Sequence, residues 1–131
     1  MRVIGIDPGT AITGFAIIEL KNNKKELLDF GYISTPAKTQ NAIRLNQIAQ
    51  DIDAILDKWK PTKASIEKLF FNKNIKTAIS VAEARGVVTQ RLAARDIEIQ
   101  ELGPSEIKSC VCGNGRADKK AVQKMVTLIM N

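Results

Sequence analysis

The order in which two apolar patterns alternate along this chain is the feature that most limits its possible folds. Residues 2–7, 12–20 and 27–34 are rich in Ile, Val and Phe and are separated by short polar connections. Such segments predict three antiparallel strands. Over residues 41–60 the apolar positions recur every three or four residues, which predicts an amphipathic helix that ends before Pro61.

The second half of the chain continues with single strands and helices. Residues 64–67 predict a short fourth strand, residues 75–95 a long helix, and residues 97–102 a fifth strand. This order predicts an α/β fold with a mixed five-stranded sheet, in which three antiparallel strands come first and parallel strands follow, flanked by helices. A chain of 131 residues has the length of one domain, so we expect residues 1–131 to form a single domain.

The long helical segment has apolar residues on two sides. One line contains Ile75, Ile79, Ala82, Gly86 and Ala93, and a second line contains Val81, Val88 and Leu92. A helix that is apolar on two sides must be covered on two sides. Either a second copy of the chain covers one side, which predicts a homodimer, or the helix lies between its own sheet and a neighbouring helix.

Acidic residues end two of the predicted strands. Asp7 closes the first strand just before the turn Pro8-Gly9, and Glu67 is the last residue of the fourth strand. Taken alone, Asp7 is explained as a turn residue and Glu67 as a solvated strand end. If the two strands are neighbours, both carboxylates lie at one edge of the sheet, where each raises the pKa of the other unless a cation is bound.

The chemistry of these two acids favours a hard divalent cation. Mg²⁺ and Mn²⁺ prefer oxygen ligands, and the chain contains no His, which argues against most zinc sites. We therefore predict that Asp7 and Glu67 bind Mg²⁺, for which Mn²⁺ can substitute.

Longer motifs around both acids carry a resemblance to a known family. The first motif is Ile4-Gly5-Ile6-Asp7-Pro8-Gly9-Thr10, followed by Thr13-Gly14, and the second is Ile66-Glu67-Lys68-Leu69-Phe70-Phe71-Asn72-Lys73-Asn74. With residues 82–87 of the long helix, and in this order and spacing, they resemble the RuvC family of Holliday junction endonucleases, which has an RNase H-like fold. An Asp-x-Gly-Thr turn also opens actin-like kinases, but that class needs a second phosphate loop and a much longer chain.

The resemblance implies a function for several residues of these motifs. It implies a homodimer that binds a four-way DNA junction and makes paired nicks by metal-dependent phosphodiester hydrolysis during recombination and repair, with a branch-migration helicase complex as a further partner. Asp7 and Glu67 match two catalytic acids of the family, which hold two ions per subunit in a complete site. Phe70 matches an aromatic residue that stacks on bases near the junction centre, although a Phe in an apolar run is more often part of a core. Lys73, in the same motif, is a further candidate for contacting DNA.

Basic residues gather toward the end of the chain. Lys108, Arg116, Lys119 and Lys120 outnumber the acids around them, and Asp118 is a predicted N-cap that places two of these lysines in the first turn of a final helix. Lysines at that position oppose the helix dipole, which a role in binding phosphate would explain, whereas a solvated basic face is the alternative. Lys108 and Lys119 also match basic residues near the scissile phosphate in the RuvC family.

The resemblance also implies metal ligands that this sequence does not contain. In the RuvC family a further helix with an aspartate-rich motif completes the metal site, and no acid follows Asp118 in this chain. We therefore expect a chain that lacks the C-terminal helix of the family. Two functions follow from this expectation: a Holliday junction resolvase, or a junction-binding protein with weak or no cleavage.

The composition favours a nucleic-acid partner and an intracellular protein, and the resemblance to the RuvC family implies a bacterial one. Lys and Arg total 20 against 14 acids, and the resulting net charge of +6 favours a polyanionic partner. Cys110 and Cys112 are too close in sequence for an ordinary disulfide and predict reduced thiols. No apolar run approaches the roughly 20 residues that span a membrane, so we expect a cytoplasmic protein with no membrane partner.

Overall fold

A mixed five-stranded sheet organises the computed structural model, which describes residues 1–9, 11–68 and 75–130. The elements are β1 (Arg2–Asp7), β2 (Ile12–Lys21), β3 (Lys24–Ser34), α1 (Asn41–Trp59), β4 (Lys63–Glu67), α2 (Ile75–Ala93), β5 (Glu98–Leu102), α3 (Pro104–Cys112) and α4 (Lys119–Met130). The strands follow the order β3-β2-β1-β4-β5 across the sheet. β1, β2 and β3 pair antiparallel, whereas β4 pairs parallel with both β1 and β5. The predicted fold class, an RNase H-like mixed sheet flanked by helices, is confirmed.

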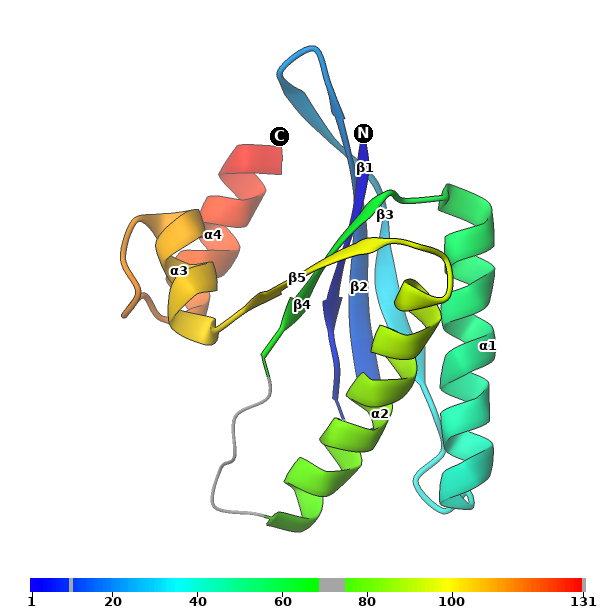
Figure 1. The fold of residues 1–131 in the computed structure, drawn as a ribbon. Coiled ribbons are helices and arrows are strands. Elements are labelled where there is room, and N and C mark those ends of the chain that lie inside the picture. Colours follow the sequence, from blue (N-terminus) through cyan, green and yellow to red (C-terminus); the bar gives the residue numbers. More distant parts are fainter. Residues whose placement is uncertain (10, 69–74, 131) are drawn as a thin grey trace.

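Helices cover both faces of this sheet. α1 and α2 lie on one face, and α3 and α4 lie on the other (Figure 1). The main core fills the space between the sheet and the α1–α2 layer, because most of the alternate residues of β1, β2 and β4 that face this layer are apolar. Its most deeply buried members are Ile4, Ile17, Ile52, Leu56, Ile66, Val88 and Leu92.

The connection between β2 and β3 is tighter than the sequence pattern predicted. The polar run from Lys21 to Lys25 was expected to separate the strands, but β2 extends to Lys21 and β3 begins at Lys24. Only Asn22 and Asn23 form the turn, with φ angles of 51° and 60°. Two consecutive residues with positive φ make the type I′ turn that joins twisted antiparallel strands most directly, and Asn tolerates this conformation well. Hydrophobic patterning alone therefore placed the start of β3 too late.

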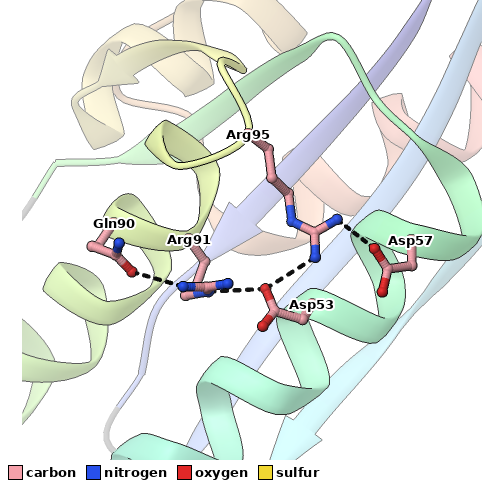
Figure 2. Close-up of polar contacts among 5 residues, drawn as sticks. All are labelled: Asp53, Asp57, Gln90, Arg91 and Arg95. Atoms are coloured by element: carbon pink, nitrogen blue, oxygen red, sulfur yellow. Dashed lines mark hydrogen bonds and ion pairs between the residues drawn. The ribbon is translucent and has the colours of Figure 1, made fainter.

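Ion pairs join α2 and the turn that follows it to α1 along one side of the helical layer. Arg91 Nε donates to Asp53 Oδ1 over 2.9 Å, and Arg95 Nη2 lies 3.3 Å from the same oxygen. Arg95 Nη1 also donates to Asp57, one turn further along α1 (Figure 2). Since Asp53 and its two arginines are about 30% exposed, these pairs are only moderately screened by solvent.

α2 lies between its own sheet and a neighbouring helix, as the second alternative for its two apolar sides predicted, while the homodimer stays a prediction. Its buried residues Ala78, Ala84, Val88 and Leu92 face the core, and α2 also packs against α1. Ile75 and Ile79, from the other apolar line, are 72% and 53% exposed. The sheet and α1 therefore cover one side of the helix, and among the described residues nothing covers Ile75 and Ile79 on the other side.

The helix α3 was not predicted from the sequence. Residues 104–112 carry too few apolar residues to show a clear helical period. The signal that would have found this helix is local, since Pro104 occupies its first turn and the Glu106 carboxylate accepts a hydrogen bond from the Gly103 N–H over 3.1 Å. The start of α4 does follow the prediction, because Asp118 Oδ1 accepts a hydrogen bond from the Ala121 N–H as an N-cap.

Candidate active site

The parallel pairing of β1 with β4 brings the two predicted acids together. Gly5 lies opposite Ser65, and Ile6 lies opposite Ile66, in the register of these strands. Ile6 and Ile66 are both buried in the core. Asp7 and Glu67, one residue further along, therefore point to the opposite face of the sheet and end neighbouring strands at the same edge.

Small residues form the floor of a cleft beside these acids. The cleft has a volume of about 500 Å³ and contains Asp7 and Glu67 in its lining. Gly5, Gly14 and Ala16, on the same face of β1 and β2, leave its floor open, and α3 forms a wall with Ile107, Cys110 and Val111. Because the sequence did not predict α3, it also did not predict that this helix lines the cleft.

Glycines let the chain turn closely around Asp7. A Cβ atom built on Gly9 would collide with the carbonyl oxygen of Ile12, so a side chain at this position would push β1 and β2 apart. Gly14 lies opposite Asp7 in the antiparallel register. A Cβ atom there would lie 3.9 Å from the Cβ of Asp7, in ordinary contact, so only a longer side chain would crowd the carboxylate.

The electrostatics of the site favour a bound cation. The pKa of Glu67 is raised above its ordinary value, first by partial burial and then by the hydrogen bond and the negative charge of Asp7. Lys108 opposes this shift, which places its ammonium close enough to act on the carboxyl group of Glu67. Two carboxylates that repel each other at the edge of a sheet are an oxygen donor set suited to a hard divalent ion. Within the described ranges, however, no cluster of three or more potential metal ligands is present.

The other predicted basic residues lie along the approach to this edge. α3 begins directly after the carboxyl end of β5, which is parallel to β4, so the start of α3 lies at the edge that carries the acids. The loop after α3 returns to this start, since a Cβ atom on Gly115 would lie 3.2 Å from the carbonyl oxygen of Ser105. Arg116, Lys119 and Lys120 follow immediately and are exposed. Phe70 and Lys73 lie outside the described residues.

Comparisons with known proteins place this geometry in a family. The family model for crossover junction endodeoxyribonuclease RuvC matches residues 3–131. The chain belongs to the RuvC family. Its relatives include the RuvC of Heliobacterium modesticaldum, 43% identical over 99% of this chain and 80% of that protein, and the RuvC of Brachyspira hyodysenteriae, 48% identical over 98% and 80%. The chain thus spans about four fifths of the length of these RuvC relatives.

Solved structures of the RuvC family agree with the fold. Thermus thermophilus RuvC superimposes with a TM-score of 0.90 at 26% identity, covering 99% of this chain and 80% of that one. The same protein in complex with a Holliday junction substrate gives a TM-score of 0.92 at 27% identity, covering 99% and 79%. The resemblance first seen in the two acidic motifs therefore extends over nearly the whole described chain.

Proposed function

We propose that this chain is a Holliday junction resolvase, an endonuclease that nicks four-way DNA junctions in recombination and repair, and that the cleft at Asp7 and Glu67 is its active site. The observation that carries the proposal is the pair of acids at neighbouring strand ends in a chain of the RuvC family. The open face of the cleft supports it further, because a phosphodiester backbone needs access from solvent to reach both carboxylates.

Asp7 and Glu67 would hold Mg²⁺, with Mn²⁺ as a substitute. Mg²⁺ is commonly bound by one or two carboxylates together with waters and phosphate oxygens of the substrate, so the two acids suit one ion directly. Bound metal ions would supply the chemistry that activates a water and stabilises the leaving oxygen. Asp7 would help to hold both ions of a complete site, and Glu67 would help to hold one of them. Lys108, whose charge acts on Glu67, would face the phosphate that is cleaved.

Asp7→Asn tests the assignment of the acids. On a synthetic four-way junction with MgCl₂, the wild-type chain is expected to nick strands in symmetric pairs, and D7N is expected to bind the junction without nicking it. Glu26→Gln is the matched control, because it removes the same charge from an exposed position in β3. Nicking by D7N at the wild-type rate would remove Asp7 from the active site.

The same assay separates the resolvase from a junction-binding protein with weak or no cleavage. The small number of potential ligands among the described residues is what favours this second candidate. Tight binding by the wild type, without nicking at any Mg²⁺ or Mn²⁺ concentration, would support the second function. Paired nicking that depends on Mg²⁺ would exclude it.

Lys108, Arg116, Lys119 and Lys120 are proposed to contact the DNA backbone. Each phosphate contact contributes roughly −0.9 to the slope of log affinity against log salt concentration. Lys119→Gln and Lys108→Gln should each make this slope shallower by about 1. Lys58→Gln is a control on α1, on the other face of the sheet. Phe70 and Lys73 stay predicted DNA contacts. For Phe70, the fluorescence of a base analogue at the junction centre would test the predicted stacking.

The exposed side of α2 is the surface proposed for a homodimer. Ile43, at the start of α1, is also exposed, and a groove between the two helices is lined by Ala49 and Gly86. Small residues allow two helical surfaces to approach closely, and the large exposed aliphatic residues in the first turns of α1 and α2 would be buried by a second copy. Ile79→Glu should convert a dimer to a monomer in sedimentation-velocity measurements, whereas a wild-type chain that is already monomeric would contradict the proposal.

Two expectations about the cellular context stay predictions. Within the described ranges, no helix has both the length and the apolar character that a membrane span requires. A cytoplasmic location and a partnership with a branch-migration helicase complex would be tested by fractionation and by co-purification from bacterial cells.

A further inference from the structure

Arg85 on α2 joins the helical layer to the edge of the sheet that carries the active site. Its Nη2 atom lies 2.7 Å from the carboxylate of Glu101 in β5. Its Nε atom is 3.4 Å from the backbone carbonyl oxygen of Glu67, a longer contact than the first. With a side chain only 19% exposed, Arg85 is the most buried of the cations in the ion pairs of the described residues.

These contacts lie on the α2 side of the sheet, opposite the cleft. Glu101 lies opposite Ile66 in the β4–β5 register, so both side chains face the α2 side of the sheet. Glu67 points to the cleft on the other side, and the contact between the two residues in the described part of the chain is from Arg85 Nε to the Glu67 backbone carbonyl. Among the described residues, Arg85 is therefore bonded to the backbone of the residue that carries one of the two acids, from the face of the sheet opposite to the Glu67 side chain.

Arg85 differs in its binding partners from Arg91 in α2 and from Arg95 just after α2. Arg91 and Arg95 pair with Asp53 and Asp57, which fastens one helix to another far from the acids (Figure 2). Arg85 pairs with the carboxyl ends of two parallel strands. The Lys68 N–H also donates to the Leu102 carbonyl oxygen over 2.8 Å, so β4 and β5 remain bonded one residue past Glu67.

We propose that Arg85 is a positioning residue of the active site, which fixes the ends of β4 and β5 from the far face of the sheet and so holds Glu67 beside Asp7. The inference rests on the proposed function, because it assigns Arg85 to the same pair of acids. A buried guanidinium can bond a carboxylate and a carbonyl at once through its planar fork, which the single ammonium of a lysine reproduces only in part.

The test compares Arg85→Gln with Arg91→Gln, which removes an arginine from the same helix and breaks an ion pair of similar length. Asp7→Asn is the reference for loss of the metal site. Three quantities are measured on the full chain: hydrogen exchange of the Lys68 amide, the Mn²⁺ concentration at half saturation in a titration without DNA, and affinity for a four-way junction in EDTA.

For Arg85→Gln we expect Lys68 exchange and the Mn²⁺ midpoint each to rise about tenfold, the size of effect expected from losing one charge-assisted hydrogen bond, with junction affinity within twofold of wild type. Arg91→Gln should change neither, even if it lowers the melting temperature by as much. Arg85→Lys should restore part of both effects, because it keeps the charge. If Arg85→Gln does not fold, Glu101→Gln, which removes the partner carboxylate, is expected to shift both quantities in the same direction.

Two results would count against these assignments in different ways. If Asp7→Asn weakens Mn²⁺ binding while Arg85→Gln, or Glu101→Gln in its place, behaves like Arg91→Gln, the positioning role is wrong and the proposed function stands. If Asp7→Asn leaves Mn²⁺ binding unchanged, the metal site itself is wrong, and the role of Arg85 falls with it.

Discussion

Replacing Asp7 by Asn should stabilise the metal-free protein while it abolishes the proposed activity. The two acids end adjacent strands, which lie about 4.8 Å apart, so we take roughly 5 Å as the separation of their charges when both are ionised and no proton bonds them. The Coulomb repulsion at that distance is about 3 kcal/mol at an effective dielectric of about 20 and just under 1 kcal/mol in water. Because Asp7 is exposed and Glu67 is half-buried, we take a value near the lower limit. D7N should therefore raise the free energy of unfolding at pH 7 by about 1 kcal/mol.

The gain should depend on pH in a direction that the raised pKa of Glu67 determines. Since the pKa of Glu67 is higher in the folded chain than in the unfolded chain, ionising Glu67 disfavours the fold. The stability of the wild type therefore falls as the pH rises from the ordinary carboxyl range through the raised pKa. In D7N the stability should fall less over this pH range, because the charge of Asp7 no longer opposes the ionisation of Glu67. The difference between the two proteins should be absent at low pH, develop across that window, and stay constant at neutral pH.

Thermal unfolding followed by circular dichroism in EDTA, from pH 3 to pH 8, measures this difference. A gain of about 1 kcal/mol corresponds to roughly 3–5 °C in melting temperature for a chain of this size. Glu26→Gln changes the net charge equally and should give no gain. MgCl₂ should raise the melting temperature of the wild type more than that of D7N, because only the wild type keeps both carboxylates. A D7N protein no more stable than E26Q at pH 7, or a difference that does not vary with pH, would refute the reasoning.

Three further substitutions test the scaffold. Ile52→Ala, at a fully buried position of α1, should lower the free energy of unfolding in urea by about 2–5 kcal/mol. Asp53→Asn should lower the free energy of unfolding by about 1 kcal/mol at pH 7. Contacts with arginine lower the pKa of Asp53, so in acid titrations this difference should disappear as the pH falls through the lowered pKa. Gly113→Ala should cost about 1 kcal/mol by calorimetry, because Gly113 ends α3 with a φ of 70°; an unchanged melting temperature would contradict it.

The placement of the two acids could be predicted because it depends on local patterns. Asp7 and Glu67 each end a short apolar segment, and the side-chain alternation of a strand fixes which face each acid takes once its neighbour is buried. What the segments alone left open was whether β1 and β4 are adjacent. That adjacency comes from the crossover through α1, which packs its buried residues Ile48, Ile52 and Leu56 onto the sheet.

Features that depend on short elements or on tertiary contacts could not be predicted in the same way. α3 is nine residues long and has no buried residue, so its apolar period is weak although it forms one wall of the cleft. Arg85 belongs to a motif that the resemblance included, yet nothing in its sequence position distinguishes it from Arg91. The fold is what shows that Arg85 binds the end of a strand and that Arg91 binds a neighbouring helix.

The two faces of β1 and β2 show how one sheet serves both a core and a site. Toward α1 and α2, the alternate positions Ile4 and Ile17 are large and fully buried, which stabilises the sheet. Toward the cleft, Gly5, Gly14 and Ala16 contribute almost no side-chain burial and leave room in front of the carboxylates. The two acids are therefore held by a sheet that is stabilised by the core on its α1–α2 face. Their mutual repulsion, which would weaken a small fold that depended on this face, is tolerated because the packing on the opposite face is undisturbed.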